Sequence, residues 1–164
     1  MGLFSPPLPL RDEIKAAISP FLFLEDVSKK TQQDGQSKIA KSQEAILAAL
    51  KPGEELIVIV PCYAGNTGYD GLAIATTERL LHFKGSRISK EMSRSSLADV
   101  DRMASPHGTF LLALISEKAA PFAQFATGDL RNRSTQVYWE GTIQVPMLTR
   151  PLMEDFIRKT GFSG

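Results

Sequence analysis

The chain has 164 residues, with 19 basic and 18 acidic side chains and a formal net charge of +1. Its composition, 43% hydrophobic and 23% charged, is typical of a globular protein and excludes a disordered, collagen-like or coiled-coil chain. A net charge this close to zero gives no overall field to attract nucleic acid, so we expect no nucleic-acid partner.

Residues 1–50 are expected to form a helical N-terminal extension. A first helix follows Pro9 and ends before Pro20, since apolar side chains recur between them with helical spacing. These side chains are Leu10, Ile14, Ala17 and Ile18. The apolar run at residues 21–24 must be covered by the rest of the chain or by another subunit.

A second helix is predicted later in the extension. The polar residues 27–36 contain Asp34-Gly35 and are predicted to form a loop. Ser37 then caps the helix, which stops at Lys51 because a residue before proline avoids the α conformation. Two arrangements fit this pattern: the extension packs on residues 51–164, or it packs on a neighbouring copy.

Residues 51–164 change to short β-type segments separated by turns. The turns recur about every ten residues, which is typical of an antiparallel sandwich or small barrel. Residues 55–63 are apolar on both faces, as in a strand covered on both sides. Further strands are predicted at residues 72–76, 80–84, 88–92, 99–104, 109–117, 121–127 and 136–145.

The last segment returns to a helical period. Thr149 is a favourable N-cap, acidic residues come early, basic residues come late, and Gly161 is the expected stop. One face of this helix is apolar, at Leu152, Met153, Phe156 and Ile157. We expect this face to seal the open end of a curved sheet.

Three phrases between residues 50 and 161 carry a family resemblance. They are LKPGEE at residues 50–55, GLAIATTERLLHF at residues 71–83 and SLADVDRM at residues 96–103. They resemble the strand openings and second hairpin of bacterial pleckstrin-homology-like (PH-like, YokE-like) domains, a hairpin also found in GRAM domains. The resemblance implies a mainly β fold with helices (α+β), in which a curved antiparallel sandwich or barrel of about seven strands is capped by the C-terminal helix. Residues 129–147 add one candidate strand to this pattern, as an insertion or an extra edge.

Few residues are candidates for chemistry. Cys62 lies in the most apolar strand, where a free cysteine behaves as a small core hydrophobe. His82 falls within a strand and His107 within a turn, so one cysteine and two scattered histidines are too few for a metal site. Asp99 and Asp101 share one face of a strand and are expected to be solvated. We therefore expect no catalytic residue, no metal and no cofactor.

One group of basic residues is a candidate binding site. Lys84, Arg87, Lys90 and Arg94 lie close together in the sequence, opposed only by Glu91. They form either a solvated face or a patch for anions and acidic lipid, where each basic residue contributes on the order of 1 kcal/mol. Residues 55–74 contain no basic side chain, unlike the first two strands of PH domains that hold phosphoinositides.

The sequence therefore predicts a non-catalytic interaction module, whose partner is another protein, a peptide or a second copy. The alternative is a module that binds the surface of an anionic membrane. A small hydrolase-type enzyme comes third, since it would need a closed pocket with converging polar groups near His82 or Cys62. The lone cysteine and the lack of an apolar stretch of about 20 residues indicate a cytoplasmic protein.

Overall fold

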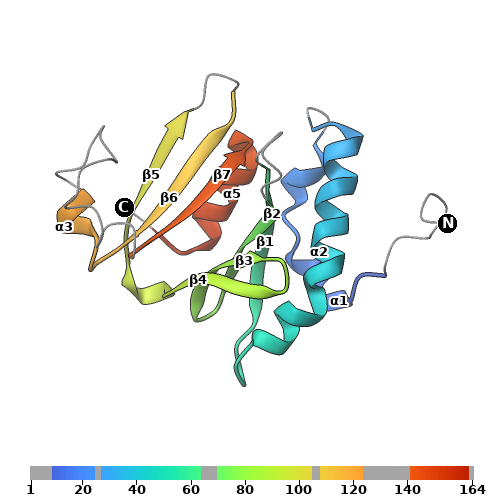
Figure 1. Cartoon of the computed structure of the whole chain (residues 1–164), viewed down its shortest axis with the longest axis horizontal. Helices are drawn as coiled ribbons and strands as arrows, with labels where there is room; N and C mark the ends of the chain where they lie inside the picture. The colour runs from blue at the N-terminus through green and yellow to red at the C-terminus, as the bar shows by residue number, and fades with distance from the viewer. Residues whose placement is uncertain (1–8, 25–26, 64–69, 105–107, 124–140, 163–164) are drawn as a thin grey trace.

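Figure 1 shows a computed structural model of the chain, an α+β arrangement in which two sheets are accompanied by helices. The structure describes residues 9–24, 27–63, 70–104, 108–123 and 141–162. Within these residues the strands form a four-stranded and a three-stranded sheet, both antiparallel. The α+β class and the C-terminal helix are confirmed, whereas the described strands form two sheets and no closed barrel.

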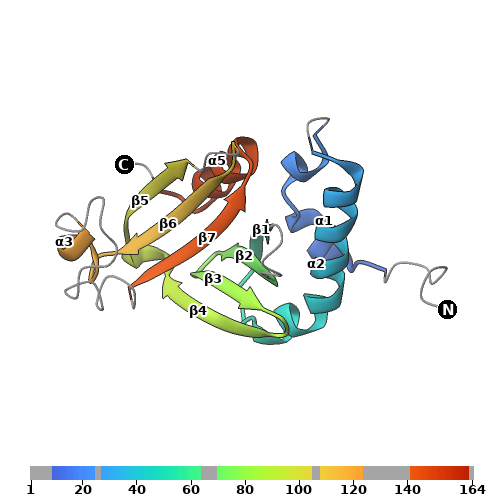
Figure 2. The same ribbon diagram turned by 45° about the horizontal axis from the view of Figure 1, so that its top comes forward.

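Each sheet is a meander of consecutive strands. The first sheet has the order β1 (Leu56–Tyr63), β2 (Asp70–Thr76), β3 (Arg79–Lys84) and β4 (Arg87–Ser93). The 3₁₀ turn η4 (Arg94–Ser96) then leads into the second sheet, with the order β5 (Leu97–Ala104), β6 (Phe110–Ser116) and β7 (Thr142–Leu148). Figure 2 shows the two sheets facing each other across the core.

The core draws on both sheets. Alternate side chains of a strand point to opposite faces, and the apolar ones that point inward join a single buried cluster. Its members from the sheets include Val58, Val60, Ala73, Leu80, Leu112, Leu114, Ile143 and Val145.

Helix α5 (Arg150–Lys159) contacts β1 and β6 and completes this core. The backbone N–H of Leu152 donates to Oγ1 of Thr149 at 3.4 Å, so the predicted N-cap is confirmed. The predicted apolar face is buried, and Phe156 is fully so. Burial of each large apolar side chain on this face contributes about 1.5–3 kcal/mol.

The N-terminal extension contains α1 (Asp12–Ala17), the 3₁₀ helix η2 (Pro20–Phe23) and α2 (Lys29–Ala49). The loop predicted at residues 27–36 is wrong, because α2 already begins there. Oγ of Ser28 accepts from the N–H of Thr31 at 3.1 Å, so Ser28 is the N-cap in place of Ser37. A glycine inside a helix costs about 1 kcal/mol. Packing of α2 on the first sheet through Ile39 and Ile46 offsets that cost at Gly35.

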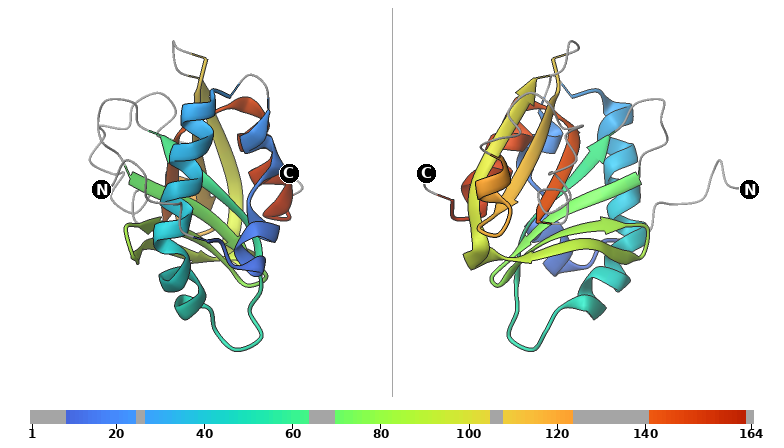
Figure 3. Two further views of the ribbon diagram at one scale, coloured as in Figure 1. Left: turned by 90° about the vertical axis from the view of Figure 1, so that its right-hand side faces the viewer. Right: turned by 60° about the vertical axis from the view of Figure 1, so that its left-hand side comes forward.

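The extension packs on the sheet of its own chain, with α2 running across the first sheet (Figure 3). The N–H of Ser19 donates to the carbonyl of Ile59 at 3.1 Å, beside a parallel bridge between Ile18 and Ile59. Oγ of Ser19 donates to Oδ2 of the buried Asp155 at 2.7 Å, which ties the extension to α5. Within the apolar run at residues 21–24, Leu22 is fully buried and Phe23 is 44% exposed.

A buried ion pair joins the end of α2 to the first sheet. Oε1 of Glu54 lies 2.6 Å from Nη2 of Arg79, and Oε2 accepts from Nε at 2.9 Å. The same carboxylate accepts from Oγ1 of Thr76 at 2.6 Å, and Arg79 also donates to the carbonyl of Ala49 at 2.9 Å. The hydrogen bond from Arg79 lowers the pKa of Glu54 from 4.5 to about 2.

Two strand predictions near the C-terminus need correction. Residues 121–127 were expected to form a strand, but the described part forms the short helix α3 (Ala120–Ala123). Pro121 suits the first turn of a helix and lacks the N–H that a sheet ladder requires. The strand expected at residues 136–145 is β7, which covers Thr142–Leu148; residues 124–127 and 136–140 lie outside the described part of the chain.

Candidate functional site

Among the strands that the structure describes, β4 is an edge of the first sheet, paired with β3 on one side. Its side chains alternate between exposed positions and the half-buried or buried positions Ile88, Lys90 and Met92. Nζ of Lys90 donates to the carbonyl of Thr142 at 3.3 Å, so this covered face of β4 points toward β7. The edge of β4 therefore borders the space between the two sheets.

The register shows which backbone groups of β4 face outward. The N–H of Arg94 donates to the carbonyl of Glu78 at 2.9 Å, and Leu80 pairs with Met92 in the same ladder. Since hydrogen-bonded and non-hydrogen-bonded pairs alternate along an antiparallel ladder, Glu91 and Ser93 direct their N–H and C=O groups away from β3. The Ser93 carbonyl accepts from Oγ of Ser96 at 2.8 Å. Both groups of Glu91 and the N–H of Ser93 remain directed to the open edge.

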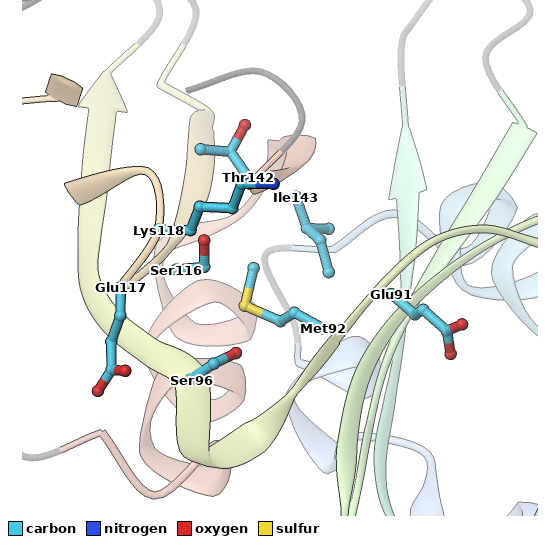
Figure 4. Close-up of a pocket in the computed structure, with 9 residues that line it drawn as sticks. Glu91, Met92, Ser96, Ser116, Glu117, Lys118, Thr142 and Ile143 are labelled. Carbon is cyan, nitrogen blue, oxygen red and sulfur yellow. The ribbon is translucent and has the colours of Figure 1, made fainter. Parts of the chain in front are cut away.

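A cleft of about 350 Å³ lies between β4 and the beginning of β7. Met92 points into it toward Ile143, and Lys118 extends across it toward Thr142 (Figure 4). The carboxylates of Glu91 and Glu117 turn away from its centre. Its lining consists of Glu91, Met92, Ser96, Ser116, Glu117, Lys118, Gly141, Thr142 and Ile143.

Two lysine charges, those of Lys84 and Lys90, act on His82 in strand β3. His82 lies opposite Lys90 in the β3–β4 ladder and is buried. Burial lowers the pKa of His82, and the charges of Lys90 and Lys84 lower it further. Burial also lowers the pKa of Lys90. A negative charge placed near these groups would raise the pKa of His82 and of Lys90 again.

The four basic residues predicted as an anion patch occupy three places. Lys84 and Arg87 face each other across the β3–β4 turn and are exposed. Lys90 lies on the covered face of β4 and donates to the carbonyl of Thr142. Nε and Nη2 of Arg94 donate to the carbonyls of Thr160 and Lys159 at 2.6 and 3.3 Å, so Arg94 satisfies the last carbonyls of α5. The structure therefore brings together Lys84 and Arg87 only.

The β3–β4 turn is itself anchored on the extension. Oγ of Ser42 in α2 donates to the carbonyl of Gly85 at 2.8 Å, and Gly85 has a φ of +65°. A residue with a side chain adopts that conformation at a cost, which explains the glycine. The contact fixes the turn that presents Lys84 and Arg87.

The remaining candidates for chemistry have structural positions. Cys62 is fully buried, and burial raises the pKa of its thiol to about 12, so the thiol stays uncharged at neutral pH. Asp99 and Asp101 are exposed on β5. His107 lies outside the described residues. In the part of the chain that the structure describes, no three His, Cys, Asp or Glu side chains are grouped to hold a metal ion.

Sequence reasoning predicted the strand at residues 88–92 but not the cleft beside it. The alternation from residue 87 to residue 93 already separates Lys90 and Met92 from their exposed neighbours, so the covered face of β4 was detectable. The positions of Lys118 and Thr142 beside β4 were not detectable, because Lys118 follows β6 and Thr142 begins β7.

No helix in the described ranges is long and apolar enough to cross a bilayer. Comparison of the chain with models of protein families, with curated proteins and with solved structures finds no match.

Proposed function

We propose that this chain is a non-catalytic, PH-like interaction module that binds an extended segment of a partner protein along β4. The observation that carries the proposal is the edge of β4 beside the open cleft. We place the protein in the cytoplasm, because its buried free thiol at Cys62 suits a reducing compartment.

Two observations support the PH-like part of the proposal. The phrases at residues 50–55, 71–83 and 96–103 resemble that family. The described antiparallel strands, followed by a C-terminal helix, agree with the curved sandwich of about seven strands and capping helix that the resemblance implies.

Binding would extend the first sheet by one strand. The incoming backbone would form hydrogen bonds with both groups of Glu91 and with the N–H of Ser93. Alternate side chains of the segment would then point into the cleft beside Met92, and the others would point to solvent. Backbone pairing supplies affinity in this mode, while the cleft supplies selectivity.

A non-catalytic role agrees with the state of the candidate nucleophile and base. The Cys62 thiol is uncharged and enclosed in the core. His82 also lies within the sheet and faces two lysine charges. An acylating cysteine needs a thiolate and access to substrate.

Replacement of Ser93 by proline tests the proposal, because it removes one outward N–H and leaves the ladder with β3 intact. Ser93 has a φ of −63°, which proline adopts without strain. Ser93→Ala is the matched control, since it also removes the hydroxyl contact with Ser95 but keeps the N–H.

Peptides selected against the wild-type chain from a random phage-displayed library provide the ligands. We expect them to slow hydrogen exchange at the Glu91 amide, to bind Ser93→Ala normally and to bind Ser93→Pro at least tenfold more weakly. Absence of any binder, or equal binding to the two variants with unchanged melting temperatures, would refute the proposal.

A second candidate function is docking on an anionic membrane. Lys84 and Arg87 carry it: both are exposed at one turn, and neither has an ion-pair partner among the residues described. Each would contribute on the order of 1 kcal/mol near acidic lipid, so two residues give weak and salt-sensitive binding.

A further inference from the structure

The centre of the cleft beside β4 is apolar. Met92 of β4 points toward Ile143 of β7, and the two residues are 9% and 1% exposed (Figure 4). Ser96 also lines the cleft, but its Oγ donates to the carbonyl of Ser93 at 2.8 Å. A side chain that entered the cleft from the edge of β4 would therefore meet the thioether of Met92 beside Ile143.

The charged side chains of the lining favour neither sign of ligand charge. They are two carboxylates and one ammonium group, those of Glu91, Glu117 and Lys118. The carboxylate of Glu91 turns outward and accepts from Nη1 of Arg79 at 2.9 Å. Glu117 and Lys118 are exposed, so their charges are solvated. An acidic or basic ligand side chain would therefore find no excess of opposite charge in this lining.

We propose that the segment docked on β4 runs antiparallel to it and places one uncharged, apolar side chain, the anchor, in the cleft opposite Met92. This inference rests on the proposed function and names the side chain and the chain direction of its partner. A charged side chain at that position would lose its water beside Met92 and Ile143 without gaining a partner, which is costly. An apolar side chain gains free energy when it leaves water.

The register of β4 fixes the position of the anchor. The backbone groups of Met92 are directed to Leu80 of β3, in the ladder that continues to the bond between Arg94 and Glu78. An antiparallel residue opposite Met92 therefore forms a pair without hydrogen bonds, in which the two side chains share one face and lie closest together. The residues on either side of the anchor point their side chains to the exposed face of β4.

The antiparallel direction continues the pattern of the sheet. The strands β1 to β4 pair antiparallel throughout, and antiparallel pairing is slightly more stable per residue. In this direction the residue after the anchor exchanges two hydrogen bonds with Glu91, and the residue before the anchor accepts from the N–H of Ser93. The N–H of the anchor itself points away from β4. In a parallel segment that N–H would instead donate to the carbonyl of Glu91.

The first test changes the selected peptides and leaves the protein as it is. In fluorescence anisotropy, alanine at one apolar position should weaken binding roughly tenfold to a hundredfold, as expected for loss of a buried apolar side chain. Aspartate and lysine at that position should each weaken binding at least as much. N-methylation of the residue after this position should abolish binding, while N-methylation of the anchor itself should leave binding nearly unchanged.

The second test locates the anchor on the protein. A photoreactive leucine analogue at the anchor position should cross-link to Met92 or to another residue of the cleft lining, which mass spectrometry of the digested complex identifies. Met92→Ala should weaken binding roughly tenfold. Met153→Ala is the matched control, because Met153 is a buried methionine of α5 that does not line the cleft. It should lower the melting temperature and leave binding unchanged.

The outcomes separate this inference from the proposed function. If peptides bind with the sensitivity to Ser93→Pro described above, but tolerate a charged residue at every position or cross-link outside the cleft, the apolar anchor is refuted and docking on β4 stands. If N-methylation of the anchor itself abolishes binding, the antiparallel direction is refuted. If no peptide shows sensitivity to Ser93→Pro, docking on β4 is itself refuted. The cross-linking result is decisive even where Met92→Ala lowers the melting temperature, because it uses the wild-type chain.

Discussion

Replacement of Glu54 by glutamine should destabilise the fold in a way that depends on pH. The pKa of Glu54 falls from 4.5 to about 2 in the folded chain, chiefly through its hydrogen bonds with Arg79. Because the folded-state pKa is lower, the contribution of the carboxylate is complete above pH 4.5 and is lost as the pH falls toward 2. The shift corresponds to on the order of 3 kcal/mol of stability at pH 7.

The measurement is urea-induced unfolding of the wild type and of Glu54→Gln at pH 7, 5 and 3. The difference in free energy of unfolding should be about 3 kcal/mol at pH 7 and about 1 kcal/mol at pH 3, since most of the linkage lies between those values. Every other titrating group is shared by the two proteins, so the difference isolates Glu54.

Glu91→Gln provides the matched control. Glu91 binds the same guanidinium at 2.9 Å, but its side chain is 54% exposed. An exposed ion pair contributes about 0–1 kcal/mol, so this variant should lose little at any pH. A Glu54→Gln difference that is the same at pH 7 and pH 3 would refute the reasoning, because the charge of the carboxylate would then not be what stabilises the fold.

Three further predictions concern other parts of the chain. Phe156→Ala should lower the free energy of unfolding by about 3–5 kcal/mol in urea, and a loss below 1 kcal/mol would contradict the role of α5 in the core. The Cys62 thiol should react with Ellman's reagent at pH 8 only as fast as the chain unfolds, because it is fully buried and burial also raises its pKa; rapid reaction without urea would contradict its burial. If the chain docks on membranes, vesicles containing phosphatidylserine should pellet it at low salt, and Lys84→Glu with Arg87→Glu should abolish pelleting; unchanged pelleting would exclude this turn as the contact.

Local signals predicted the parts of the fold that depend on neighbouring residues. Thr149 and Gly161 bound the C-terminal helix because capping and a φ of +83° are properties of short segments. The Asp34-Gly35 turn signal failed, because α2 has 21 residues and its packing outweighs one unfavourable glycine. Tertiary contacts, rather than the local turn signal, therefore determine that this segment is helical.

The candidate site was predictable only in part for the same reason. Alternation along one strand separates Lys90 from Arg87, but no local rule shows that Lys90 reaches Thr142, which belongs to another sheet. Arg94 lies near the other basic residues in sequence, yet its guanidinium binds carbonyls at the end of α5. A cluster in sequence became a cluster in space only at Lys84 and Arg87, which one tight turn holds opposite each other.

Because of the bridge between Ile18 and Ile59, the two edges of the four-stranded sheet differ in how readily another strand can pair with them. With Ser19 also bonded to Ile59, the chain interrupts the far border of the sheet with its own backbone. The edge strand β4 of one molecule would therefore find no equivalent open edge at Ile59 of a second molecule. Edge-to-edge addition of one sheet to the next into a fibre would stop after the first addition.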